Sequence, residues 1–396
     1  MINQINIKNF KSIVDLTIPL GRFNVIIGPN GCGKSNILEA IAFASAAAEN
    51  KLDNEYLLNR DVRVADPEFM INGFADEDNN DDETDIGLEN QDDARDFIQI
   101  KVDDEKNLFL CQLVFHDALK TWVNVPQIVS GKLGTVLSHP EELSLGLQKK
   151  IQDINEHLAE VGISIEDIIK LMEKVRTPIP ELSNFLTYRP TEHYLRKTFE
   201  TPIFPIGIHG EGLLKYLKEC AEEKNVDFFN ELDMGLRLLD WFDGIHIPDN
   251  LMKNEYRLSI GDKFLSESLH YFDQRSTNEG FLFILFYLTL FNSVNTPTFF
   301  AIDNIESALN PKLVTKLTEY LIERSFHNNK QVIVTTHSPY VLDGLDLSNP
   351  DVRLFVARRD IDGHTRIERI PYREDRPMKL SQLWMSGLIG GLPDNF

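Results

Sequence analysis

The sequence predicts an α/β fold built around a mostly parallel sheet, and two observations lead to this class. The apolar, β-branched run at residues 22–27 leads through a glycine-rich loop into the helix-patterned residues 36–41. Two further apolar runs, residues 298–302 and 331–336, are separated by a helical pattern at residues 311–326. Strands that are apolar throughout and alternate with helices are typical of a parallel sheet covered on both faces.

Length and composition narrow the class of protein. The chain has 396 residues, a formal net charge of −22 and three scattered cysteines, which suit neither a disulfide framework nor a metal cluster. No apolar run is long enough to span a membrane, and the N-terminus lacks the pattern of a secretory signal. We therefore expect a cytoplasmic protein of one large domain or two lobes. Its acidic field does not attract DNA, so any DNA contact requires a local basic groove or a partner.

The N-terminal part is predicted to form strands around the glycine-rich loop. Isoleucine spacing indicates a first strand from Ile2, then a turn at residues 8–11 and a second strand at residues 14–18. Residues 97–127 alternate as an antiparallel meander, which predicts a β subdomain. Its expected strands are residues 97–102, 108–115 and 121–125.

One segment of this part is strongly acidic. From Asp76 to Asp96 there are eleven acidic residues and one basic residue, Arg95. We expect residues 75–96 to form a solvated, disordered loop. The alternative is a contact for a basic partner, or a guard against unproductive nucleic-acid binding.

The middle of the chain is predicted to be an inserted, mainly helical lobe. Residues 141–175 have helical spacing over a few turns, and another helix is expected at residues 212–225. A strongly apolar helix at residues 280–293 precedes the last two strands. The expected units are residues 1–130 and 266–396, the two parts of one head, and residues 131–265, the inserted lobe.

Residues 28–35 read GPNGCGKS, which is the Walker A pattern placed between a strand and a helix. Glycines let backbone N–H groups curve around a polyphosphate, and the helix start adds its positive dipole end. Lys34 can reach the β- and γ-phosphates, and the Ser35 hydroxyl can ligate Mg²⁺. We therefore predict a site for a nucleoside triphosphate. The predicted nucleotide-binding residues are Asn30, Gly31, Cys32, Gly33, Lys34, Ser35 and Asn36.

Polar residues at the later strand ends predict the other half of this site. Asp303 follows residues 298–302, where P-loop proteins hold Mg²⁺ through water in the Walker B role. His337 ends the next strand, where an imidazole can contact the γ-phosphate or the attacking water. Residues 276–280 offer a hydroxyl, an amide and a glycine at a helix start. Each of these features is weak evidence by itself, but their order along the chain after a Walker A motif is a far more specific indication.

On these motifs, and on residues 5–12, the chain resembles the RecF/SMC-like, ABC-type ATPases. The similarity lies with the AAA-family subgroup of phage-defence and overcoming-lysogenization-defect systems. It implies an ABC-type ATPase head with ATP and Mg²⁺ as cofactors, a switch role for His337, and head-to-head dimers. Residues 188–192 lie where relatives carry a switch comparable to the Q-loop. The resemblance assigns the in-trans signature to Ser276, Asn278, Glu279 and Gly280, and the D-loop to Ser307 and Asn310.

Residues 302–311 and 383–396 are similar to the PtuA family, the ATPase subunits of Septu anti-phage systems, which work with an HNH nuclease. This resemblance implies an ATP-gated scaffold that regulates a partner nuclease. The alternative is a RecF/SMC-like repair ATPase that acts directly on DNA. A transporter subunit is the least favoured function.

The main departure from the ABC pattern follows the Walker B aspartate. Active ABC ATPases have a glutamate there that polarises the attacking water, and this chain has Asn304. An amide cannot accept a proton, and general-base assistance contributes about 10²–10⁴-fold in rate. With Asn304 and His337 as the catalytic residues, we expect slow hydrolysis and ATP acting mainly to hold the dimer closed. Glu306 either substitutes or, as we favour, begins the D-loop helix as an acidic residue.

Overall fold

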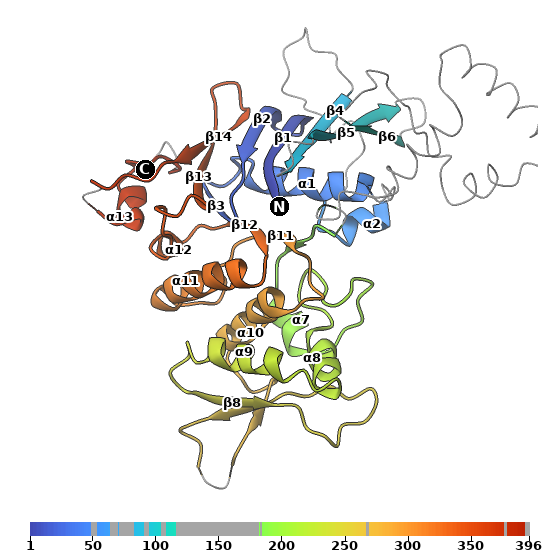
Figure 1. Ribbon diagram of the computed structural model, residues 1–396, viewed down its shortest axis with the longest axis vertical. Helices are drawn as coiled ribbons and strands as arrows, with labels where there is room; N and C mark the ends of the chain where they lie inside the picture. Colours follow the sequence, from blue (N-terminus) through green and yellow to red (C-terminus); the bar gives the residue numbers. More distant parts are fainter. Residues whose placement is uncertain are drawn as a thin grey trace, which may run out of the picture.

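The computed structural model describes residues 1–48, 54–63, 70, 83–90, 95–103, 108–115, 182, 184–266, 269–375 and 378–392. An upper lobe holds both chain ends and the two larger sheets, and a lower lobe holds a cluster of helices and a small sheet (Figure 1). The helical pattern at residues 141–175 and the expected strand at residues 121–125 lie outside the described residues.

The central sheet has six strands and is mostly parallel, which confirms the predicted class. All neighbouring strands are parallel except β13 and β14, which form an antiparallel hairpin. The edge strand β7 comes from residues 131–265, so the predicted inserted lobe contributes to the sheet of the head. In sheet order the strands are β14 (Thr365–Ile370), β13 (Val352–Arg359), β3 (Phe23–Ile27), β12 (Gln331–Thr335), β11 (Phe299–Ile302) and β7 (Thr187–Tyr188).

Both faces of this sheet are buried at β3, β11 and β12, because these strands are largely apolar on both sides. Val25 and Ile27 of β3 belong to a core shared with α10 (Glu279–Asn292), whereas Ile26 belongs to a second core shared with α1 (Lys34–Ala48). The side chains of β11 and β12 alternate between these two cores in the same way. The period of two places helices on both faces and leaves the strand ends for chemistry.

A second, antiparallel sheet of five strands confirms the predicted β subdomain. Helix α1 packs between this sheet and the central one (Figure 1), and its buried alanines, such as Ala40 and Ala44, allow a close approach. A short helix, α2 (Asn54–Leu58), follows α1. In sheet order the strands are β2 (Ile13–Pro19), β1 (Ile2–Phe10), β4 (Glu83–Asn90), β5 (Arg95–Asp103) and β6 (Leu108–Phe115).

The acidic segment, predicted as a loop, contains strand β4, and this part of the prediction is wrong. β4 pairs antiparallel with β1 on one side and with β5 on the other. Ile86 is fully buried, so the strand delivers an apolar side chain to the core despite its charge. The local charge predicts disorder, but backbone pairing with the distant strand β1 and with the following strand β5 outweighs it. Residues 75–82 and 91–94 lie outside the described part of the chain.

The lower lobe contains most of the remaining helices. The helices predicted at residues 212–225, 280–293 and 311–326 are confirmed to within a few residues. The helices of this part and of the C-terminal region are α7 (Glu192–Arg196), α8 (Leu213–Glu222), α9 (Val226–Leu236), α11 (Pro311–His327), α12 (Pro339–Leu342) and α13 (Leu380–Met385). The small sheet has strands β8 (Phe242–His246), β9 (Ser259–Asp262) and β10 (Phe272–Asp273).

A buried lysine supports the end of α10. This helix is apolar on all sides and has buried residues from Phe281 to Phe291, as expected for a helix covered on every side. Lys330 is 2% exposed, and its Nζ donates to the carbonyl oxygens of Ser293 at 2.7 Å and Thr296 at 2.9 Å. Burial lowers the pKa of Lys330 to about 8, so the amine is mostly protonated at neutral pH.

Lys330→Met is expected to lower the free energy of unfolding by about 3 kcal/mol, because buried carbonyl oxygens lose their donor. This corresponds to a melting temperature lower by roughly 5 °C. Thermal unfolding followed by intrinsic fluorescence measures the shift. Lys316→Met, an exposed site on α11, is the control and should melt like the wild type. Equal melting temperatures for the two variants would show that Lys330 is not a structural residue.

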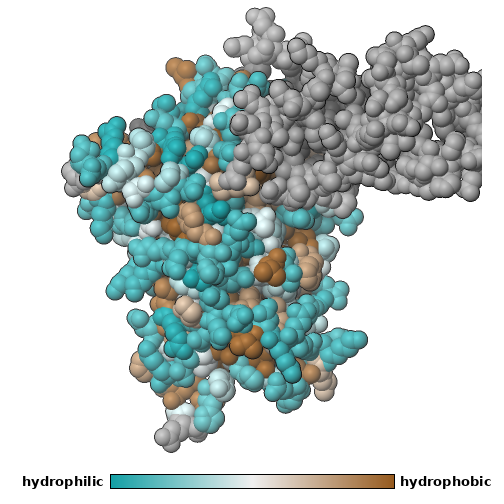
Figure 2. Space-filling view, in the orientation of Figure 1, coloured by the Kyte–Doolittle hydropathy of each residue, from teal (hydrophilic) through white to brown (hydrophobic). Residues whose placement is uncertain are grey.

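The surface is mostly hydrophilic. On the face shown in Figure 2, hydrophobic residues occur in small groups over the described part, as on ordinary protein surfaces. In the described residues we find no helix that combines the length and the apolar character needed to cross a bilayer.

Candidate nucleotide-binding site

The Walker A loop runs from the end of β3 to the start of α1 and packs against the β13–β14 hairpin. Gly28 and Gly33 have φ angles of 153° and 101°. A Cβ atom at Gly28 would lie 2.3 Å from the carbonyl oxygen of Ala357, and one at Gly33 would lie 2.0 Å from Thr365 Oγ1. Both positions therefore require glycine for space as well as for conformation.

Thr365 fastens the hairpin to the loop. Its buried hydroxyl donates to the carbonyl oxygen of Cys32 at 3.0 Å and accepts from Ser12 Oγ at 2.7 Å. Ser12 in turn accepts from Asn36 Nδ2 at 2.7 Å. Two predicted nucleotide-binding residues, Cys32 and Asn36, are thus held by a chain of hydrogen bonds. The sequence did not point to Thr365, which is 333 residues from Cys32 and carries no local signal.

Hydrogen bonds from two cationic side chains also stabilise the start of α1. Lys11 Nζ donates to Glu39 Oε2 at 2.6 Å, and Arg63 Nε donates to Glu39 Oε1 at 2.5 Å. Arg63 also donates to Asn36 Oδ1 at 2.9 Å. Because Asn36 donates and accepts at once, its orientation is fixed beside the loop.

Lys34 lies folded over the loop itself. Its Nζ donates to the carbonyl oxygens of Gly28 at 2.8 Å and Pro29 at 3.0 Å, and the residue is only 7% exposed. Burial lowers the pKa of Lys34, whereas the charges of Asp303 and Glu306 favour its protonated form. The acidic residues after β11 therefore lie close to the Walker A lysine.

Asp303 reaches this edge because β11 lies beside β12, and β12 beside β3. Its buried carboxylate accepts a hydrogen bond from Thr335 Oγ1 at Oδ1. Arg189 donates to Oδ2 through Nε at 3.1 Å and through Nη2, and it also pairs with Asp61 at 2.8 Å. The carboxylate predicted to have the Walker B role is therefore paired with a cation in this structure. The sequence named residues 188–192 as a switch but assigned Arg189 no partner.

The residues after Asp303 form a turn rather than the start of a helix. Asn304 has a φ of 56°, in the left-handed region that asparagine tolerates well. Glu306 Oε2 accepts from Thr336 Oγ1 at 2.7 Å, and Oε1 accepts from the backbone N–H of His337 at 2.8 Å. The favoured expectation that Glu306 begins the D-loop helix is wrong, because α11 begins at Pro311. The side chain turns inward instead.

His337 lies beside these groups and is exposed. Burial, followed by the charge of Lys34, lowers the pKa of His337, so its imidazole is neutral at neutral pH. A neutral imidazole carries one donor and one acceptor nitrogen, which suits a contact to a phosphate or to a water.

The predicted signature and D-loop residues have structural partners. Asn278 caps α10 by accepting from Phe281 N at 2.9 Å, and Asn310 caps α11 by accepting from Leu313 N at 3.0 Å. The remaining predicted residues lie as follows: the N–H of Ser276 donates to Asp273 O, Glu279 is in the first turn of α10, Gly280 follows it, and Ser307 Oγ donates to Asn304 O. Ser276 and Asn278 therefore bond with residues of their own lobe.

The residues present fit a magnesium triphosphate. The loop provides backbone N–H groups without Cβ atoms at Gly28 and Gly33, and a Cβ at Gly31 would meet open space. Lys34 supplies a positive charge, Ser35 a hydroxyl at the start of α1, and Asp303 a carboxylate. Oxygen ligands of this kind suit Mg²⁺, and the helix start suits phosphate.

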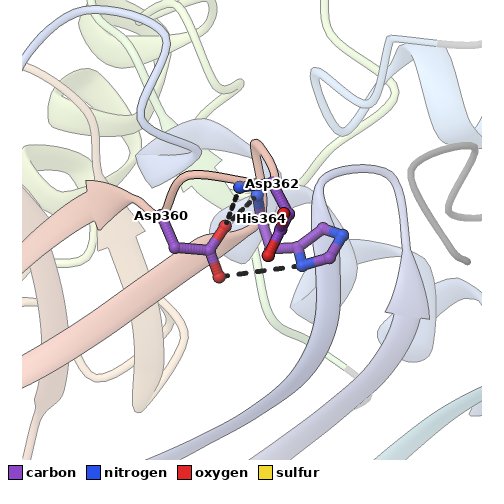
Figure 3. Close-up of side chains that lie close together, drawn as sticks. All are labelled: Asp360, Asp362 and His364. Atoms are coloured by element: carbon purple, nitrogen blue, oxygen red, sulfur yellow. Dashed lines mark hydrogen bonds and ion pairs between the residues drawn. The ribbon is translucent and has the colours of Figure 1, made fainter.

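A second cluster, Asp360, Asp362 and His364, resembles a cation site, but the carboxylate of Asp360 is already bonded by the protein (Figure 3). Asp360 Oδ1 accepts from the N–H groups of Asp362 at 3.2 Å and His364 at 2.8 Å. Its Oδ2 accepts from Arg366 Nε at 2.7 Å and lies 3.7 Å from His364 Nδ1. These bonds stabilise the hairpin turn that carries Thr365, and we assign the cluster this structural role.

Two family models match the sequence. One, described as an AAA domain, matches residues 4–227, which is more than half of the chain. The other, described as "AAA domain, putative AbiEii toxin, Type IV TA system", matches residues 243–343. The matched ranges include the Walker A loop in the first case and Asp303 in the second.

Curated relatives match over shorter stretches. The sn-glycerol-3-phosphate import ATP-binding protein UgpC of Vibrio vulnificus (strain YJ016) is 46% identical over 65 residues, which is 15% of this chain and 18% of UgpC. The OLD nuclease of Thermus scotoductus is 46% identical over 41 residues, 10% of this chain and 8% of the nuclease. The DNA replication and repair protein RecF of Chlorobium phaeobacteroides is 32% identical over 148 residues, 36% of this chain and 34% of RecF. The chain thus spans about a third or less of each relative.

Solved structures match over nearly the whole chain. An Smc head bound to the C-terminal winged-helix domain of ScpA has a TM-score of 0.55 at 17% identity and covers 93% of this chain and 98% of that one. An Smc head with an extended coiled coil, bound to the C-terminal domain of ScpA from Pyrococcus furiosus, has a TM-score of 0.50 at 16% identity and covers 93% and 96%. At this identity the likeness shows the fold, which is that of an SMC head.

Proposed function

Because the chain belongs to the AAA domain family of ATPases and has the fold of an SMC head, we propose that it binds ATP with Mg²⁺ and closes into a head-to-head dimer. One observation supports the proposed binding of ATP with Mg²⁺. The glycine loop with Lys34 and the carboxylate of Asp303, 269 residues apart in sequence, meet at one sheet edge. Ser35 and Asp303 would hold the Mg²⁺, and residues 30–36 would bind the phosphates.

The dimer part rests on the location of the signature segment. Ser276, Asn278, Glu279 and Gly280 lie at the start of α10 in the lower lobe, which is a phosphate-suited helix terminus. Asn278 and Ser276 bond there with their own lobe. In the proposed dimer this segment contacts the ATP of the second copy, and Ser307 and Asn310 line the seam between the copies. The nucleotide then joins two surfaces, so its binding energy drives association.

We further propose that the dimer scaffolds or regulates a nuclease of the HNH type, as the similarity of residues 302–311 and 383–396 to Septu ATPases implies. Slow turnover suits this role, because long-lived ATP keeps the dimer closed. A second candidate function is DNA repair by direct action on DNA, which the 32% identity to RecF favours. Direct, ATP-dependent binding to DNA ends without a partner would support repair, and ATP-dependent co-purification with an HNH nuclease would support the scaffold.

Sedimentation velocity tests the dimer. With ATP and Mg²⁺ the wild-type chain is expected to sediment at twice the monomer mass, and without nucleotide as a monomer. Lys34→Met, whose affinity for ATP should be much lower, is the control and is expected to remain monomeric at an ATP concentration that just saturates the wild type. A wild-type chain that binds ATP and stays monomeric would contradict the proposed dimer while leaving nucleotide binding intact.

A further inference from the structure

The Glu306 carboxylate is hydrogen-bonded to the two residues that follow β12, at the sheet edge that also carries Asp303. Among the described residues, each of its oxygens accepts one hydrogen bond, from the hydroxyl of Thr336 and from the N–H of His337. A carboxylate oxygen can accept two, so both oxygens retain acceptor capacity. The side chain is only partly exposed, and a turn between β11 and α11 holds its backbone.

The charge of the same carboxylate acts on both the predicted phosphate-binding lysine and the predicted switch histidine. Burial lowers the pKa of both Lys34 and His337, and the charge of Glu306 opposes that shift at each of them. Glu306 is therefore close to the two groups that flank the proposed γ-phosphate position. No other residue of the turn offers a carboxylate there, apart from Asp303, which is paired with Arg189.

The backbone conformation at position 304 favours asparagine over glutamate. Asn304 has a left-handed φ of 56°, a conformation that costs most L-residues about 1–2 kcal/mol and that asparagine adopts more readily. Moving from this position to Glu306 returns the chain to ordinary backbone geometry, since Glu306 is not among the residues of positive φ.

We propose that Glu306 is the catalytic general base for ATP hydrolysis, in place of the missing carboxylate at Asn304. This inference rests on the proposed ATP binding. In the step, the water oxygen forms a bond to the γ-phosphorus, and the bond from that phosphorus to the bridging oxygen breaks, leaving its electron pair on ADP. The water proton passes to a carboxylate oxygen of Glu306 and then to solvent. We therefore expect ATP hydrolysis to be faster than in a site where Asn304 is the only residue that orients the attacking water.

A purely structural role for Glu306 makes a different prediction. Glu306→Gln keeps the shape and an amide oxygen for the N–H of His337, and Thr336 Oγ1 can turn to accept from the new amide. A side chain that only ties the turn to β12 is therefore replaced with little loss. Glutamine cannot replace a general base, because its amide cannot accept the proton of the attacking water.

The test compares Glu306→Gln with Glu319→Gln, an exposed glutamate on α11. We measure ATP affinity by calorimetry and single-turnover hydrolysis by released phosphate. Glu306→Gln is expected to bind ATP like the wild type and hydrolyse it about 10²–10⁴-fold more slowly. Glu319→Gln should match the wild type in both. Turnover of Glu306→Gln within threefold of wild type would overturn the proposal, as would a wild type that binds ATP without hydrolysing it.

Two further results separate failure of the general-base proposal from a failure to fold and from failure of the proposed function. If Glu306→Gln does not fold, Glu306→Asp decides, since it keeps a carboxylate but moves it by one methylene. A displacement of about 1 Å can cost about 10²-fold in rate, so unchanged turnover in Glu306→Asp would also overturn the proposal. A wild-type chain that binds no ATP would instead refute the proposed function itself.

Discussion

Replacing Lys34 with methionine is expected to weaken ATP binding by about 10- to 150-fold. Methionine keeps the length and apolar stem of the side chain but removes the ammonium group. A hydrogen bond to a charged group contributes about 1.5–3 kcal/mol, and every 1.4 kcal/mol is about tenfold in affinity. The ammonium is already buried beside the loop, held by the carbonyl oxygens of Gly28 and Pro29, so little ordering cost offsets its gain on binding.

Isothermal titration with ATP and Mg²⁺ measures this loss. Lys8→Met is the matched control, because the Lys8 side chain is 55% exposed on β1, and it should bind ATP like the wild type. Thermal melting of both variants checks that the fold is retained. Equal affinities for Lys34→Met and wild type would show that this loop is not a phosphate site.

Adding one methyl group at Gly33 is expected to be far more damaging than adding one at Gly31. Both residues have positive φ, 101° and 76°, so alanine is strained at each. At Gly33 the new Cβ would also lie 2.0 Å from Thr365 Oγ1, whereas at Gly31 it meets nothing within 4 Å. Thr365 cannot move away without breaking its bonds to Cys32 and Ser12.

We expect Gly33→Ala to lower the free energy of unfolding by about 2–5 kcal/mol, combining backbone strain with overpacking. Gly31→Ala should cost about 1 kcal/mol, from strain alone. Chemical denaturation gives both values, and ATP titration should show the larger loss for Gly33→Ala. Similar destabilisation by the two substitutions would mean that the hairpin does not brace the loop.

Much of the fold could be predicted from the sequence because burial imposes local patterns. The strands around the Walker A loop and Asp303 are apolar on both faces, and α10 is apolar on all sides, so each shows a clear pattern. Strand β4 could not be predicted in this way. Its acidic composition masks the alternation around Ile86, and its stability comes from pairing with β1 and β5.

The candidate site also combines residues that the sequence predicts with contacts that it does not predict. Lys34, Ser35, Asp303 and His337 were predicted because each follows a recognisable strand. The hydrogen bonds and ion pairs of these residues join distant parts of the chain, as between Arg189 and Asp303. No local sequence pattern encodes such contacts. The direction of Glu306 depends on the left-handed turn at Asn304, which a residue type alone does not specify.

The most direct test of the central claim, that the loop and Asp303 share one magnesium triphosphate, is an ATP titration of the wild type and Asp303→Asn, with and without Mg²⁺. We expect one ATP per chain and tighter binding with Mg²⁺ in the wild type. In Asp303→Asn the gain from Mg²⁺ should be largely lost while metal-free binding persists. Binding that gains equally from Mg²⁺ in both proteins, or no binding in the wild type, would contradict the claim.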